Sequence, residues 1–99
     1  MSDAGIDVAW DTNKAQLNIA KHGVTFAHAA TVLLDPLAMT VFDEEHSQSE
    51  ERWFTLGMSS ESKLLAVSHT YQPAGLDRAQ VRIISAREAT RAEREQYEN

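Results

Sequence analysis

A short polar segment near the middle of the chain carries side chains suited to acid–base chemistry. It runs from Asp43 to Arg52 and reads Asp-Glu-Glu-His-Ser-Gln-Ser-Glu-Glu-Arg. A histidine such as His46 titrates near neutral pH, a carboxylate such as Glu50 can accept a proton or fix the imidazole tautomer, and the guanidinium of Arg52 can clamp a phosphate. The segment predicts proton transfer beside a bound anion. The alternative is a solvated loop in which Glu50 simply pairs with Arg52.

Three further cations are candidates for holding an anion. Arg82 lies in an apolar strand pattern, where an arginine is either paired with a carboxylate or held for a ligand. Arg87 is predicted in the first turn of a terminal helix, where a cation is unfavourable unless an anion lies nearby. Lys21 is predicted in the last turn of a helix, where either the helix dipole or a phosphate explains it. We group Arg82 with the acid–base segment and predict phosphate contacts for Lys21 and Arg87.

These residue types are sufficient to cleave RNA without a metal or cofactor. A base removes the proton of the 2′-hydroxyl, a cation stabilises the crowded phosphate, and an acid protonates the leaving oxygen. DNA lacks that hydroxyl and should be inert. The sequence has no glycine-rich phosphate loop and no serine elbow. A metal-independent mechanism fits the inventory best, and a zinc site built from His22, His46 and His69 is the open alternative.

Length and composition indicate one globular domain. The 99 residues, 42% of them apolar and 24% charged, form a single domain over residues 1–99. No apolar run reaches the roughly 20 residues that a membrane span needs, and the N-terminus has no signal-peptide pattern, so we expect a cytoplasmic protein with no membrane contact. The sequence contains no cysteine, and therefore no disulfide or thiolate metal site.

The net charge of −6 argues against unaided binding to RNA, because phosphate neutralisation supplies most non-specific affinity. The arginines are clustered, however: all except Arg52 lie between Arg78 and Arg94. A local basic patch is therefore compatible with an acidic protein, and the acidic remainder suits a surface that a basic partner covers.

The elements that position these residues follow from hydrophobic period and from capping residues. Asp11 or Thr12 caps the first helix and Gly23 closes it, Thr25 caps the second helix, and Asp35-Pro36 ends that second helix. A capping box of Ser85 and Glu88 opens the last helix. The predicted elements are strand 6–10, helix 13–22, helix 26–34, strands 38–42, 52–58, 63–71 and 80–85, and helix 86–97. This order predicts an α+β fold with an antiparallel four- to five-stranded sheet, two N-terminal helices and one C-terminal helix.

Several side chains are given structural roles. Leu17 and Ala20 are expected on the buried side of the first helix, with Asn18 elsewhere. His28 is expected to pack in the core, and His69 to be a core histidine hydrogen-bonded across the sheet. Exposed ion pairs are expected between Arg91 and Glu95 and between Arg94 and Glu98.

The ordered motifs resemble the BrnT family of toxins. The resemblance rests on Trp10-Asp-Thr-Asn-Lys14, Asn18 and Lys21-His-Gly-Val-Thr-Phe26, on His46-Ser47 followed by Glu50-x-Arg52, and on Arg82-Ile-Ile-Ser-Ala-Arg87. It extends from Asp7 to Tyr97 without a large gap. Each motif is weak alone, and the ordered set is specific.

The resemblance implies a RelE-like fold and a metal-independent endoribonuclease of a type II toxin–antitoxin system. It implies catalytic roles for His46, Glu50, Arg52 and Arg82, with Lys21 and Arg87 binding RNA. The implied partner is a BrnA-like ribbon-helix-helix antitoxin. The protein would contact DNA only indirectly, through this antitoxin. The alternative is a catalytically inactive module that acts as the antitoxin's partner in transcriptional autoregulation, and the net acidity favours it.

Overall fold

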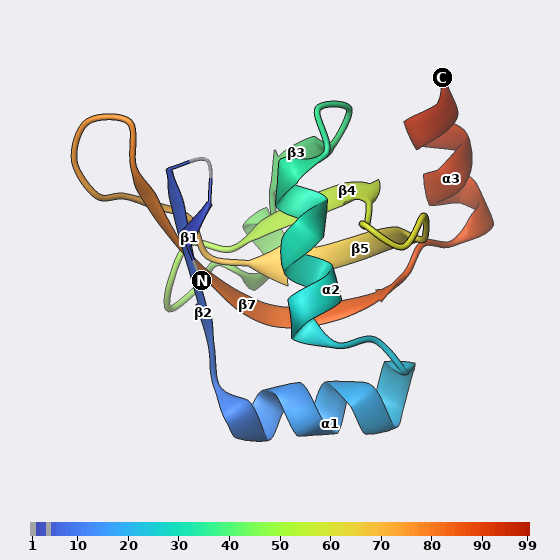
Figure 1. Cartoon of the computed structure of the whole chain (residues 1–99), viewed down its shortest axis with the longest axis horizontal. Coiled ribbons are helices and arrows are strands. Elements are labelled where there is room, and N and C mark those ends of the chain that lie inside the picture. Colours follow the sequence, from blue (N-terminus) through green and yellow to red (C-terminus); the bar gives the residue numbers. More distant parts are fainter. Residues whose placement is uncertain (1, 4) are drawn as a thin grey trace.

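The computed structural model describes residues 2–3 and 5–99. Within these described residues, three α-helices and two 3₁₀ helices accompany the strands (Figure 1). The helical elements are α1 (Thr12–His22), α2 (Phe26–Thr31), η1 (Val32–Leu34), η2 (Glu44–His46) and α3 (Arg91–Glu98). The strands are β1 (Ser2–Asp3), β2 (Ile6–Trp10), β3 (Met39–Phe42), β4 (Trp53–Met58), β5 (Leu64–His69), β6 (Gln72–Pro73) and β7 (Ala79–Glu88).

The strands form one mixed sheet in the order β1-β2-β7-β5-β4-β3, with β6 paired to β7 outside this path. The pairs β3–β4, β4–β5 and β5–β7 are antiparallel, as predicted. The prediction of a fully antiparallel sheet of four to five strands was wrong, because β2 pairs in parallel with β7, Val8 lying opposite Val81. This pairing joins segments far apart in the sequence, so no local pattern reports it. The short strands β1 and β6 were not predicted.

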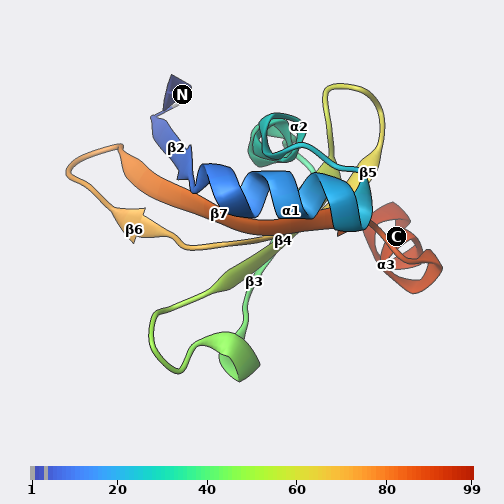
Figure 2. The same ribbon diagram turned by 90° about the horizontal axis from the view of Figure 1, so that it is seen from below.

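The two faces of the sheet are covered by different helices. Alternate residues of β5 point to opposite faces, Leu65 and Val67 to one and Leu64 and Ala66 to the other. The first face forms the main core with α2 and is also covered by α1, and both helices lie on the same side of β7 in Figure 2. The second face packs against α3 through Tyr97.

Helix α1 begins and ends where capping predicted. The Asp11 side chain accepts a hydrogen bond from Lys14 N at 3.1 Å, and Gly23 has a φ of 70°. The predicted buried face was wrong: Leu17 is 69% exposed, whereas Asn18 is buried. Asn18 is fully bonded there, since its amide donates to the carbonyls of Val24 and Ala86 and accepts from Ala86 N. Asn18 thereby ties α1 to β7.

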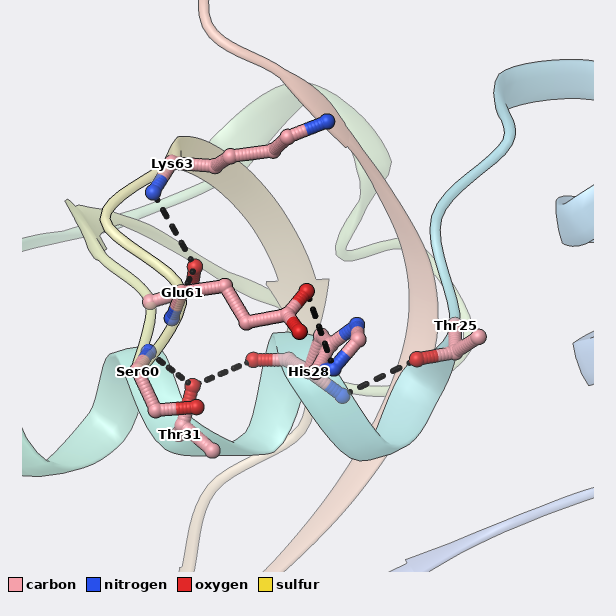
Figure 3. A network of polar contacts seen from close by, with 7 residues as sticks. Thr25, His28, Thr31, Ser60, Glu61 and Lys63 are labelled. Carbon is pink, nitrogen blue, oxygen red and sulfur yellow. Dashed lines mark hydrogen bonds and ion pairs between the residues drawn. The ribbon is translucent and has the colours of Figure 1, made fainter.

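The second predicted helix is divided, because the chain tightens from α2 into η1 for its last turn. His28 was predicted to pack in the core and does not. Its side chain is 43% exposed, and its Nε2 lies 3.2 Å from a carboxylate oxygen of Glu61 in the β4–β5 turn (Figure 3). Beside it, Thr31 Oγ1 accepts a hydrogen bond from Ser60 N at 2.9 Å. These contacts fasten the turn to α2.

His69 is a core histidine bonded across the sheet, as predicted. It is 1% exposed, and its Nε2 lies 2.6 Å from Thr55 Oγ1, which in turn lies 2.8 Å from Thr40 Oγ1. Burial lowers the pKa of His69 below its usual value. This histidine links β5 to β4 and has no access to solvent.

The C-terminal elements differ most from the prediction. β7 continues through Ser85 and ends at Glu88, so the predicted capping box of these two residues does not exist. The capping box is formed instead by Thr90 and Glu93, which open α3 at Arg91. The apolar period of a strand and the polar spacing of a cap overlap between 85 and 90, and pairing with β5 extends the strand. The predicted pairs Arg91–Glu95 and Arg94–Glu98 are present, at 3.7 and 4.0 Å.

No helix among the described residues is long and apolar enough to cross a lipid bilayer.

Candidate active site

The loop between β3 and β4 is folded by its own polar side chains. Asp43 caps η2 by accepting a hydrogen bond from His46 N at 3.3 Å. Ser47 Oγ donates to the Asp43 carbonyl at 2.5 Å and accepts from Arg52 N at 2.9 Å, so one hydroxyl joins the two ends of the loop. The backbone of Asp43 also donates to the Arg52 carbonyl at 2.8 Å. The loop is therefore a fixed support for its outer side chains.

His46 is oriented by Asp43. Its side chain is 63% exposed, and its Nδ1 lies 2.9 Å from Asp43 Oδ2. An ionised carboxylate can only accept a hydrogen bond, so in the neutral imidazole Nδ1 carries the proton and Nε2 has the lone pair. This arrangement leaves Nε2 available to a ligand, as in the histidine–carboxylate pairs of many hydrolytic sites.

Arg52 and His46 line the same hollow. The hollow has a volume of about 290 Å³, and Glu45, Gln48 and Ser49 complete its wall. The Nε of Arg52 is buried and makes no hydrogen bond with any described residue. The predicted pair of Arg52 with Glu50 is not formed, because Glu50 pairs elsewhere. The structure thus places a guanidinium group that pairs with no described carboxylate beside an oriented imidazole.

Glu50 forms an ion pair with Arg82 of β7. Both side chains are partly exposed, at 37% and 44% respectively. The backbone of Arg82 is fixed by Thr70, whose hydroxyl accepts from Arg82 N at 2.9 Å. Glu50 therefore does not orient His46, which was one of its two predicted roles. The pair brings Arg82 to the edge of the loop that carries His46 and Arg52.

Arg87 and Lys21 lie away from this cluster. Arg87 is on β7 and not in the first turn of a helix, and it bonds both carboxylate oxygens of Glu93 at 2.8 and 3.0 Å. That hydrogen bond lowers the pKa of Glu93 to about 2 and raises the pKa of Arg87. Lys21 lines a hollow of about 190 Å³ beside Ser85. Its helix α1 lies across β7 from the β3–β4 loop (Figure 2).

Two supporting residues were missed in the sequence. Asp43 orients His46, and Thr70 fixes the backbone of Arg82. The spacing of Asp43 and His46, three residues apart, is that of a helical cap and is a local signal. Thr70 gives no such signal, because its contact depends on the pairing of two distant strands. Among residues 2–3 and 5–99, no three His, Asp or Glu side chains are grouped as metal ligands.

The sequence of this chain matches a known class of protein. Residues 10–93 match the model of a family described as the ribonuclease toxin, BrnT, of a type II toxin–antitoxin system, so the class is a small α+β ribonuclease toxin. The chain belongs to this BrnT family.

A solved structure supports the same assignment. The chain is 29% identical to the Brucella abortus ribonuclease toxin BrnT, known from a crystal structure at 1.1 Å resolution. The match covers 85% of this chain and 96% of that one, with a TM-score of 0.59. No curated protein matches the chain. The family predicted from the motifs is thus confirmed.

Proposed function

We propose that this ribonuclease toxin cleaves RNA without a metal ion, and that its reaction takes place at the β3–β4 loop. The observation that carries the proposal is the convergence of His46 and Arg52 on one hollow, beside the pair that Glu50 forms with Arg82. His46 and Arg52 thus share one hollow, and the same loop carries Glu50, whose carboxylate holds a second guanidinium group, that of Arg82. These are the groups that phosphodiester cleavage by a 2′-hydroxyl requires.

His46 is the proposed general base. With Nδ1 held by Asp43, its Nε2 can take the proton of the 2′-hydroxyl, and the Asp43 carboxylate then stabilises the imidazolium. The nucleophile belongs to the RNA, so the protein forms no covalent intermediate. The protonated imidazole of His46 then returns this proton to the leaving 5′-oxygen as the bond between that oxygen and phosphorus breaks.

Arg52 and Arg82 are the proposed phosphate ligands. Arg52 has no carboxylate partner among the described residues, so it can bind a phosphate without breaking an ion pair. Arg82 must exchange Glu50 for the phosphate, which frees the Glu50 carboxylate for proton transfer. Lys21 and Arg87 are proposed to contact RNA beyond the scissile phosphate, although Arg87 must first leave Glu93.

The proposed partner is a BrnA-like ribbon-helix-helix antitoxin, and the proposed fold type is RelE-like. The net charge of −6 supports a basic partner, because a negatively charged protein attracts positively charged molecules. Contact with DNA would be made by the antitoxin alone. We place the pair in the cytoplasm, where its RNA substrate is found.

A second candidate is a binding module without ribonuclease activity. It is favoured by charge pairing, since Arg82 and Arg87 are both neutralised by glutamates of the same chain. In that case the protein would bind the antitoxin and modulate transcription, without any cut RNA.

The test is cleavage of a naked, end-labelled RNA by purified protein in EDTA. We expect 2′,3′-cyclic phosphate ends from the wild type, and at least a roughly hundredfold slower reaction for His46→Ala. The matched control is His28→Ala, an exposed histidine on α2, which should cut like the wild type. Cutting that survives in His46→Ala, or that EDTA abolishes, would contradict the proposal. Absence of cutting by all three proteins would favour the binding module.

A further inference from the structure

A second hollow lies immediately beside the proposed active site. It has a volume of about 510 Å³ and is formed by the end of the β3–β4 loop and the segment that joins β5 to β6. Glu50 lines it, so it adjoins the Glu50–Arg82 pair directly. Thr70, which fixes the backbone of Arg82, also lines it. A group bound here would therefore lie next to a phosphate held by Arg82.

One wall of this hollow is aromatic. Tyr71 is 47% exposed, and its ring meets Trp53 edge to face, with centroids 6.4 Å apart and planes at 67°. Trp53 is in turn braced by Phe42 at 5.2 Å. An exposed ring held in a fixed orientation by other rings is a suitable platform for stacking a nucleobase, and such stacking does not depend on phosphate.

The charge of the hollow excludes a phosphate and favours N–H donors. Glu50 and Glu51 line it, and no lysine or arginine does. Glu50 is engaged by Arg82, whereas the Glu51 side chain forms no hydrogen bond or ion pair with any described residue. A carboxylate can only accept hydrogen bonds. Glu51 is exposed at this hollow, so its carboxylate is available to accept hydrogen bonds from a ligand bound there.

The edge that matches a carboxylate best is that of guanine. Its N1–H and N2–H point in the same direction and can bond both oxygens of one carboxylate. Adenine and cytosine present a donor beside an acceptor on this edge, and uracil presents one N–H between two carbonyls. Only guanine can bond both oxygens of the carboxylate without placing a lone pair of the base against the negative charge.

We propose that this hollow binds an unpaired guanine next to the cut phosphate, with the base stacked on Tyr71 and its N1–H and N2–H bonded to Glu51. This subsite would determine the base at which the toxin cuts. The inference rests on the proposed ribonuclease function, and it assigns to Glu51 the selection of the substrate.

The first experiment measures base binding without cleavage. The ¹⁵N-labelled protein is titrated with the 5′-monophosphates of guanosine, inosine, adenosine, cytidine and uridine, and the amides of Glu51, Thr70 and Tyr71 are followed by NMR. We expect guanosine monophosphate to bind most tightly and inosine monophosphate, which lacks the N2 amino group, to bind about tenfold more weakly. The shared phosphate serves as an internal control for binding at Arg82.

Variants then identify the contacts. Glu51→Gln should remove the preference for guanosine over inosine, and Glu44→Gln, an exposed glutamate on η2 that does not line the hollow, should keep it. Tyr71→Phe should bind like the wild type, whereas Tyr71→Ala should bind every nucleotide about tenfold more weakly. The NMR spectrum of each variant shows directly whether it is folded.

Cleavage separates this inference from the proposed function. RNAs that differ only by guanine or inosine at one unpaired position should be cut with kcat/KM values that differ about tenfold, and the ratio should fall to about one in Glu51→Gln. Guanosine-selective binding by a protein that cuts no RNA would support the subsite and overturn the ribonuclease proposal. Cutting without base preference would support the ribonuclease proposal and overturn the guanine subsite. Equal binding of all five nucleotides, or protection of these amides only by the antitoxin, would overturn the subsite.

Discussion

The ion pair of Arg87 with Glu93 is expected to hold α3 on the sheet, and the substitution Glu93→Gln tests it. The glutamine keeps an amide oxygen for the backbone N–H of Thr90, which Glu93 now accepts at 2.8 Å, so the capping box is largely retained. Only the charge interaction with Arg87 is lost. Because the glutamate side chain is just 19% exposed, the loss should be measurable.

The magnitude follows from the pKa of Glu93. It falls from 4.5 to about 2, chiefly through the hydrogen bond from Arg87. At roughly 1.4 kcal/mol for each pH unit this corresponds to about 3 kcal/mol. The Arg87 side chain is 39% exposed, so solvent screens part of the interaction, and we expect Glu93→Gln to lower the free energy of unfolding by about 1–2 kcal/mol at pH 7.

The same pKa fixes the pH dependence. A depressed carboxyl pKa stabilises the fold fully above the unfolded value near 4.5, and this contribution is lost as the pH falls towards 2. The difference between wild type and Glu93→Gln should therefore be constant from pH 7 to 5 and shrink below pH 4. Urea unfolding followed by circular dichroism at pH 7, 5 and 3 measures it.

The control for this prediction is Glu95→Gln on the same helix. Glu95 pairs with Arg91 at the surface, where the side chains are 67% and 94% exposed, and its loss should change stability little. The reasoning is refuted if Glu93→Gln is as stable as the wild type at pH 7, or if the difference between them does not depend on pH.

Three further substitutions test other parts of the structure. Arg52→Ala should abolish growth arrest on expression and leave the melting temperature nearly unchanged; an equal loss of folding would assign Arg52 to the core. Gly23→Val should cost about 1–2 kcal/mol in urea unfolding, because a β-branched residue resists a φ of 70°, whereas Gly23→Asn should be tolerated, and a normal melt for the valine variant would contradict the cap. Asn18→Leu should cost about 3 kcal/mol in the same assay, because it leaves Ala86 N and the carbonyls of Val24 and Ala86 unpaired; retention of stability would show that α1 is held by apolar contacts alone.

The elements that the sequence predicted well are those with local signals. Strand β2 and helix α1 lie where alternation and the caps predicted at Asp11 or Thr12 and at Gly23 placed them, because these signals involve neighbours within a few residues; the structure selects Asp11 as the N-cap. The buried histidine at 69 was also predictable, since an apolar strand surrounds it. The order of the motifs along the chain also predicted the family correctly.

The errors concern contacts between distant segments. Ser85 and Glu88 have the spacing of a capping box, yet pairing with β5 keeps them in a strand, and Thr90 and Glu93 open the helix instead. Arg87 consequently lies in a strand and not, as predicted, in the first turn of a helix. Asn18 was placed on the polar side of α1 because its side chain is polar, although three hydrogen bonds satisfy it in the interior.

The sequence by itself thus determined the α+β class, the family and the loop that carries His46, Glu50 and Arg52, because period, capping and motif order are written in neighbouring residues. Only the tertiary structure decided the partners of those side chains. It pairs Glu50 with Arg82, gives Asp43 to His46 and leaves Arg52 without a carboxylate among the described residues. These choices depend on which strands lie together, and strand pairing is set by the packing of the whole chain rather than by local propensity.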